Sequence, residues 1–284
     1  MRACAGLKRF ITRSSKTKMD EHFFEARGIY YRTNNWVSGR PTLVFVHGLS
    51  GSSSAWRPYE ERLKNKHNLL TFDLRGHGRS LKRKAYSAYE IKHFAKDLRL
   101  LLEHCGASKI VLISHSFGTL IALEFLVLHQ QMVDRTIFLS TSFSPSKSRV
   151  AKLIAPLLKI TSAFEYLPFR ERTAGHIDYA KYPNTGDWNL RRMLADVPNT
   201  GLRVYLYCTR QSLSIDLEEF LTHITIPVLI MHGKKDSIFP VKNSLIMKER
   251  IKGAQLILLE DTDHIIVLNK ADEVVDAILR FICI

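Results

Sequence analysis

Cysteine is scarce in this 284-residue chain, which argues against a fold held together by disulfide bonds. The four cysteines are scattered and include no C-x-x-C pair: Cys4, Cys105, Cys208 and Cys283. No cluster of His and Cys at metal-ligand spacing accompanies them. We therefore expect reduced thiols in a cytoplasmic protein, with no metal and no other cofactor.

Long apolar runs are also missing. No stretch reaches the roughly 18 apolar residues of a transmembrane helix, so we expect none. Residues 1–21 are basic, contain several Ser and Thr, and have no acidic residue before Asp20. They lack the apolar core of a secretory signal, and we expect a flexible basic arm. A mitochondrial transit peptide would have a similar composition and remains an alternative.

Acidic residues are too few to balance the basic ones. The chain has 42 Lys and Arg against 27 Asp and Glu, which gives a net charge of +15. Such an excess favours anionic partners, either nucleic acid or a membrane surface. The basic residues are spread out, however, and their densest group, between Arg79 and Lys84, has no nucleic-acid motif beside it. We expect no nucleic-acid partner and keep weak contact with an anionic membrane surface as an alternative.

Short apolar runs alternate with helical patterns along most of the chain. The runs that fit strands of a parallel sheet covered on both faces are 43–47, 69–73, 110–114, 136–140, 228–231 and 255–259. Residues 22–32 form a further short extended piece. This order predicts an α/β fold with a mostly parallel central sheet flanked by helices.

The expected helices lie between these runs. Ser87 and Glu90 have the spacing of a capping box, which predicts a helix beginning there. Residues 117–129 and 242–251 have further helical patterns. Asn269 is a candidate N-cap for the last helix.

Residues 144–224 break the alternation of strands and helices. They contain apolar and aromatic side chains but no clear strand–helix pair. An insertion of this length predicts a cap or lid between core segments 22–143 and 225–284. A helix from Val150 to Ile160 could touch a membrane with its apolar face, although packing onto the core explains the same pattern.

A serine at the junction of an apolar strand and a helix is the strongest chemical signal. Small residues, Ser114 and Gly118, stand two places before and after Ser116. A nucleophile on a sharp strand-to-helix turn needs such neighbours because larger side chains would clash. The turn also directs the backbone N–H of Phe117 at developing negative charge. An ordinary serine-rich turn would show the same short pattern.

A Gly/Ser-rich loop follows the apolar run 43–47. Such a loop can supply a second backbone donor to an oxyanion, and we expect it to be the N–H of Leu49. His47 stands at the end of the strand, where we expect it to stabilise the turn rather than act as a catalytic base.

An acid and a histidine follow the ends of two later strands. Asp236 comes after run 228–231, and His264 comes after run 255–259. Active-site groups in open α/β sheets gather at the carboxyl ends of the strands, so both should lie near Ser116. Asp261 and Asp263 are the alternative acids.

Together these segments resemble the α/β-hydrolase superfamily, in its branch of capped serine esterases and lipases. The resemblance covers about residues 40–284 and rests on FVHGLSG, TFDLRGHGRS, SHSFGT, MHGKKDSIFP and DTDHIIVLN, in the order typical of the family. It implies that Ser116 is the nucleophile, His264 the general base and Asp236 the acid that orients the histidine. It also implies that the backbone N–H groups of Leu49 and Phe117 form the oxyanion hole. The family usually has glycine where Ser114 stands, and serine is small enough to fit there.

The resemblance implies an esterase or lipase that hydrolyses a carboxylic ester through an acyl-enzyme. The aromatic and apolar insertion suggests a small-molecule substrate with an apolar acyl group. Thioesterases, carbon–carbon bond hydrolases, aminopeptidases and cofactor-free haloperoxidases keep the same serine and stay open. A non-catalytic sensor or scaffold that keeps the fold is the alternative from another class.

Overall fold

The computed structural model describes residues 18–147, 156, 158–171 and 175–283. A sheet of eight strands forms its centre, in the order β1-β2-β4-β3-β5-β6-β7-β8. The strands are β1 (Asp20–Phe24), β2 (Ile29–Thr33), β3 (Thr42–Val46), β4 (Asn68–Phe72), β5 (Ile110–His115), β6 (Val133–Leu139), β7 (Val228–Gly233) and β8 (Gln255–Leu259). From β4 to β8 all neighbouring strands run parallel, which confirms the predicted fold class.

The first two strands form an antiparallel hairpin at one edge of the sheet. The extended piece predicted at 22–32 is therefore two strands. The chain reverses at residues 25–28, where Gly28 has a φ of +68° and donates its N–H to the Phe24 carbonyl at 2.8 Å. Most of the predicted basic arm lies outside the described residues, and its last two residues, Asp20 and Glu21, already belong to β1.

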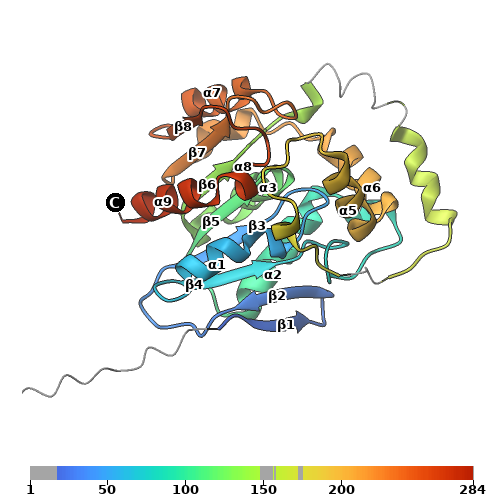
Figure 1. Ribbon diagram of the computed structural model, residues 1–284, viewed down its shortest axis with the longest axis horizontal. Helices are drawn as coiled ribbons and strands as arrows, with labels where there is room; N and C mark the ends of the chain where they lie inside the picture. Colours follow the sequence, from blue (N-terminus) through green and yellow to red (C-terminus); the bar gives the residue numbers. More distant parts are fainter. Residues whose placement is uncertain (1–17, 148–155, 157, 172–174, 284) are drawn as a thin grey trace, which may run out of the picture.

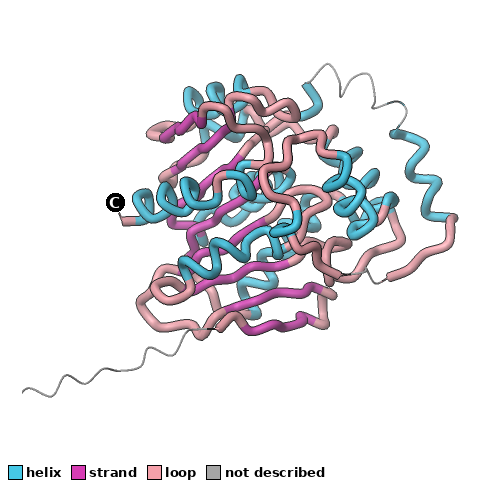
Figure 2. The backbone as a smooth tube through the Cα atoms, in the orientation of Figure 1, coloured by secondary structure: helices cyan, strands magenta, loops and turns pink. Residues whose placement is uncertain are grey.

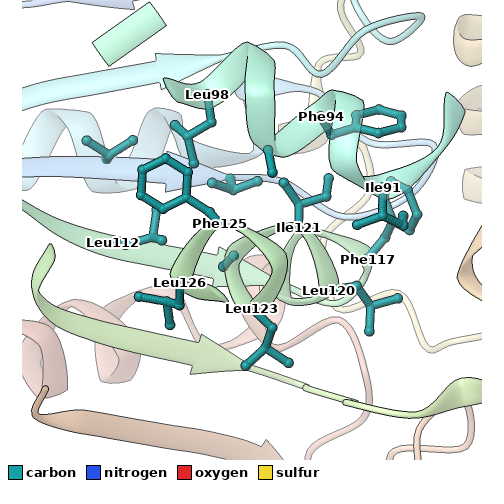
Figure 3. Close-up of a cluster of buried hydrophobic side chains, with 14 of the residues drawn as sticks. Ile91, Phe94, Leu98, Leu112, Phe117, Leu120, Ile121, Leu123, Phe125 and Leu126 are labelled. Carbon is teal, nitrogen blue, oxygen red and sulfur yellow. The ribbon is translucent and has the colours of Figure 1, made fainter. Parts of the chain in front are cut away.

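Helices cover both faces of the sheet (Figures 1 and 2). On one face lie α2 (Ile91–His104), α3 (Phe117–His129) and α7 (Val241–Arg250), and on the other lie α1 (Arg57–Leu63) and α9 (Ala271–Ile282). Alternate residues of each strand point to opposite faces, so the apolar strands supply two separate cores. Figure 3 shows part of the first core, where Phe94 and Leu98 of α2 meet Ile121 and Phe125 of α3.

Two predicted helix starts are wrong. Ser87 lies within a 3-10 turn, η2 (Tyr86–Tyr89), and α2 begins only after it, with Glu90 at its N-cap and no side-chain capping bond. Asn269 ends the short helix α8 (Ile266–Asn269), and Lys270 is the N-cap of α9. The side-chain amide of Asn269 instead donates a hydrogen bond to the Thr185 carbonyl at 3.0 Å, so it links α8 to a distant part of the chain.

Residues 144–224, which we call the inserted segment, connect β6 to β7. Their described part contains helical elements and no strand: η4 (Pro145–Lys147), η5 (Lys159–Tyr166), η6 (Tyr179–Lys181), α5 (Leu190–Thr200), α6 (Leu202–Ser212) and η7 (Glu219–His223). Figure 1 shows α5 and α6 at one side of the sheet, apart from the helices that cover its faces. The helix predicted at 150–160 lies mostly outside the described residues.

Within the described ranges, no helix is both long enough and apolar enough to span a bilayer. Three of the cysteines, Cys105, Cys208 and Cys283, are free thiols, and Cys4 lies outside those ranges.

Candidate active site

Ser116 occupies a sharp turn between β5 and α3. Its φ of 53° and ψ of −120° are unfavourable for a residue with a side chain, and such strain persists only where the surroundings enforce it. A Cβ on Gly118 would stand 2.6 Å from the carbonyl oxygens of Val46 and His47, so no larger residue fits there. Ser114 is fully buried. The close packing explains why small residues flank Ser116.

The structure brings Ser116, His264 and Asp236 together at the carboxyl ends of β5, β8 and β7. Nε2 of His264 lies 2.6 Å from Oγ of Ser116, and Nδ1 lies 2.7 Å from Oδ2 of Asp236. All three side chains are buried. Neither alternative acid approaches the imidazole in this way. Asp261 is exposed and pairs with Lys235, and Asp263 accepts from the N–H of Ile265.

Asp236 is held as an ionised carboxylate. Its Oδ1 accepts from the N–H groups of Ile238 at 2.9 Å and Phe239 at 2.8 Å. Burial by itself would raise the pKa of Asp236. Hydrogen bonds from His232 and His264, the charge of His264 and the backbone donors outweigh burial and hold the pKa well below its usual range. The carboxylate can therefore orient the His264 ring and stabilise positive charge on it.

The two predicted oxyanion-hole donors, the backbone N–H groups of Leu49 and Phe117, belong to segments next to Ser116. Phe117 is the first residue of α3, so its N–H has no acceptor in a preceding helical turn. The loop after β3 approaches closely, because a Cβ on Gly48 would lie 3.2 Å from Cβ of Ser116. Leu49 and Phe117 both line the cavity in front of Ser116, so their N–H groups are candidates for binding an oxyanion.

His47 stabilises the loops beneath the site. Its Nε2 accepts from the N–H of Leu74 at 3.0 Å, which places the proton on Nδ1, next to the Gly48 carbonyl at 2.8 Å. Burial lowers the pKa of His47 to about 4, so the ring is neutral. This contact joins the loops that follow β3 and β4.

A cavity of about 910 Å³ opens in front of Ser116 and His264. Its walls come from the loops after the core strands and from the inserted segment, with a mainly apolar lining that includes Leu49, Phe117, Leu120, Phe143, Met193, Ile238, Phe239, Ile246, Ile265 and Leu268. Three residues of the inserted segment add a polar cluster. The Tyr179 hydroxyl donates to Asp196, and Arg192 forms an ion pair with Asp196 at 3.1 Å. Burial raises the pKa of Asp196 to about 6.

Comparison with known proteins gives the family of the chain. The family model for the alpha/beta hydrolase fold matches residues 41–271. The chain belongs to the alpha/beta hydrolase family. This alpha/beta hydrolase is 26% identical to a proline iminopeptidase of Saccharolobus solfataricus, over 89% of its own length and 88% of that relative.

Solved structures show the same fold. A deep-sea metagenome alpha/beta hydrolase, MGS-M2, matches with a TM-score of 0.74 and 20% identity, over 93% of this chain and 98% of that one. The enol-lactonase of Burkholderia xenovorans LB400 matches with a TM-score of 0.67 and 19% identity, over 90% and 96% of the two chains.

Four residues around the site of this alpha/beta hydrolase were not predicted from the sequence. His232 lies at the end of β7, with Nε2 3.0 Å from both Oδ2 of Asp236 and the Phe239 carbonyl oxygen. His115 contacts the His264 carbonyl through its own Nε2 at 2.9 Å. The other two are Asp187 and Ser237, and the backbone N–H and hydroxyl of Ser237 both donate hydrogen bonds to the Asp187 carboxylate.

Sequence signals existed for only two of these residues. His232 and His115 stand at strand ends next to predicted site residues, a position that could have drawn attention to them. Asp187 lies in the inserted segment, where no periodic pattern marks it. In the part of the alpha/beta hydrolase that the structure describes, no group of three or more His, Cys, Asp or Glu side chains could hold a metal ion.

Proposed function

We propose that this protein is a serine hydrolase that cleaves a carboxylic ester through an acyl-enzyme intermediate. One observation carries the proposal: an unbroken chain of short contacts runs from Ser116 through His264 to Asp236, at 2.6 and 2.7 Å, beside a large cavity. A serine hydroxyl alone is a weak nucleophile, and a hydrogen-bonded, oriented histidine is what activates it.

The chemistry follows from these contacts. Nε2 of His264 takes the hydroxyl proton as Oγ of Ser116 bonds to the ester carbonyl carbon. The carbonyl oxygen becomes an oxyanion, which the N–H groups of Leu49 and Phe117 stabilise. The bond to the leaving alcohol then breaks, and His264 returns the proton to that alcohol. Water repeats the attack on the acyl-enzyme, which releases the acid and restores the serine.

The cavity supports a small-molecule ester with an apolar acyl group. Its walls are mainly apolar, and the inserted segment supplies part of them, as a cap over the site would. A smaller polar cluster around Asp196 offers one place for a hydrogen-bonding group of the substrate. The free thiols of the described cysteines support a reducing, cytoplasmic location.

The bond that is cleaved needs a direct test, since the named relatives include a peptidase and a lactonase. We would label wild type and Ser116→Ala with a fluorophosphonate and assay both on p-nitrophenyl esters of increasing acyl length. Loss of labelling and of turnover together in the variant would support a serine esterase, and the best acyl length would measure the pocket. Labelling of wild type without ester turnover would redirect the search to thioesters, amides or carbon–carbon bonds. Absence of labelling in folded wild type would favour a non-catalytic role.

A further inference from the structure

Asp187 of the inserted segment reaches into the space between two core loops. Its side chain is buried and accepts three hydrogen bonds. Oδ1 accepts from the backbone N–H of His264 at 2.7 Å. Oδ2 accepts from the backbone N–H of Ser237 at 2.9 Å and from its hydroxyl at 2.7 Å.

The three donors belong to the loops that carry the acid and the base. His264 supplies one donor from its own backbone. Ser237 directly follows Asp236 and supplies the other two. A single carboxylate from the inserted segment therefore joins the loop after β7 to the loop after β8, at the residues on which the Ser116–His264–Asp236 contacts depend.

Further hydrogen bonds restrain the chain around Asp187. Arg192 donates from its guanidinium to the Asp187 carbonyl at 3.0 Å. The Trp188 indole N–H donates to the Ser237 hydroxyl at 2.8 Å. The amide of Asn269 holds the Thr185 carbonyl at 3.0 Å. Asp187 thus has little freedom to move independently of the two loops.

We propose that Asp187 is a positioning residue for the hydrolysis and that the inserted segment must be docked for full activity. Without its carboxylate, the N–H groups of His264 and Ser237 would lack their acceptor, and the loops would relax toward other partners. Proton transfer from Ser116 needs the imidazole within a fraction of an ångström of its place. This inference rests on the proposed serine hydrolase function.

The test compares Asp187→Ala and Asp187→Asn with a control, Asp178→Asn. Asp178 lies in the same inserted segment, but its carboxylate is exposed and contacts only its near neighbours in the chain, the Ala180 N–H and the Lys181 ammonium group. For an ester that wild type hydrolyses, we expect kcat of Asp187→Ala to fall on the order of 10²-fold with KM little changed. Asp187→Asn should recover part of this loss, because its amide oxygen can still accept from one loop. The control should match wild type.

Two results would overturn the proposal. The first is an unchanged kcat in Asp187→Ala. The second is a raised KM with kcat preserved, which would make Asp187 a substrate-binding residue. A melting curve followed by circular dichroism identifies a variant that fails to fold. If Asp187→Ala does not fold, Asp187→Asn is compared with wild type instead.

Hydrogen exchange of the backbone amides tests the same contact without any substrate. We expect faster exchange in segments 233–239 and 261–266 of Asp187→Ala, and no change in Asp178→Asn. Unchanged exchange in both segments would refute the positioning role even if wild type hydrolyses esters. If wild type neither labels with fluorophosphonate nor turns over an ester, the proposed function fails, while the exchange data still decide whether Asp187 holds the loops.

Discussion

His232 and His264 approach the same carboxylate oxygen, Oδ2 of Asp236, at 3.0 and 2.7 Å. The first ring is completely buried and is supported by Ser244, whose Oγ lies 2.6 Å from its Nδ1. Two imidazole rings therefore contact the Asp236 carboxylate, and the ring of His232 limits how far this carboxylate can rotate away from His264.

Replacing His232 with Phe should slow turnover by removing this second contact. A hydrogen bond to a charged group contributes about 1.5–3 kcal/mol, so we expect kcat to fall about 10- to 100-fold. Ser244→Ala leaves the imidazole in place and should have a smaller effect. Steady-state kinetics on a p-nitrophenyl ester would measure both, and equal losses in the two variants would contradict this account.

Asp236→Asn should slow turnover severely. The amide can donate to Nδ1 of His264, which favours the tautomer that cannot accept the Ser116 proton. We expect a decrease in kcat of about 10⁴-fold. Asp261→Asn is the matched control, because that carboxylate is exposed and pairs only with Lys235. Comparable kcat values for Asp236→Asn and wild type would remove Asp236 from the mechanism.

Gly118→Ala should destabilise the protein. The added Cβ would meet two backbone carbonyl oxygens at 2.6 Å, and backbone atoms cannot move aside as flexible side chains do. Overpacking of this kind costs about 1–3 kcal/mol or more, which should lower the melting temperature by several degrees. Gly186→Ala should be nearly neutral, because its nearest neighbour, Oδ2 of Asp263, lies 3.8 Å from the added carbon. Equal melting temperatures for the two variants would refute the steric argument.

Stability should fall as the pH drops below 6.5. Burial lowers the pKa of His47 to about 4 and the pKa values of His77 and His115 to about 3, against 6.5 for an ordinary histidine. Between pH 6.5 and these lower pKa values, each of the three histidines binds a proton in the unfolded chain but not in the folded chain. Each histidine then costs about 1.4 kcal/mol of unfolding free energy per pH unit, so the stability present above pH 6.5 is lost progressively at lower pH.

Urea denaturation at pH 7 and pH 5 would measure this loss. His77→Gln should reduce the pH dependence by about one proton, since one of the three titrating groups is gone. Similar unfolding free energies for wild type at the two pH values would contradict the prediction.

The sequence predicted the parallel strands because they are short and mostly apolar. It missed the start of β6, since Val133 is buried but the exposed Asp134 and the partly buried Arg135 interrupt the apolar run. It missed the hairpin of β1 and β2 because residues 22–32 predict one extended piece, whereas the chain reverses at residues 25–28. The two helix starts were predicted wrongly because serine and asparagine are common N-cap residues. Here Ser87 lies within η2 and Asn269 ends α8.

The candidate site could be predicted where its geometry is local. The turn at Ser116 is set by its immediate neighbours, and the positions of Asp236 and His264 follow from the strands before them. The contact between Asp187 and His264 joins residues 77 positions apart in the chain. No spacing or periodicity encodes such a contact, because it depends on how the inserted segment packs against the core.

The parallel pairing of β6 with β7, from Thr136 opposite Val228 to Leu139 opposite Met231, joins the two halves of the core on either side of the inserted segment. Ser116 belongs to the first half, and Asp236 and His264 belong to the second. Two fragments separated by a cut within the inserted segment would each lack part of the proposed Ser116–His264–Asp236 triad. For an ester that the intact protein hydrolyses, cleavage by a mixture of the two fragments would show that they reassociate through the pairing of β6 with β7, as the two parts of a split-enzyme reporter do.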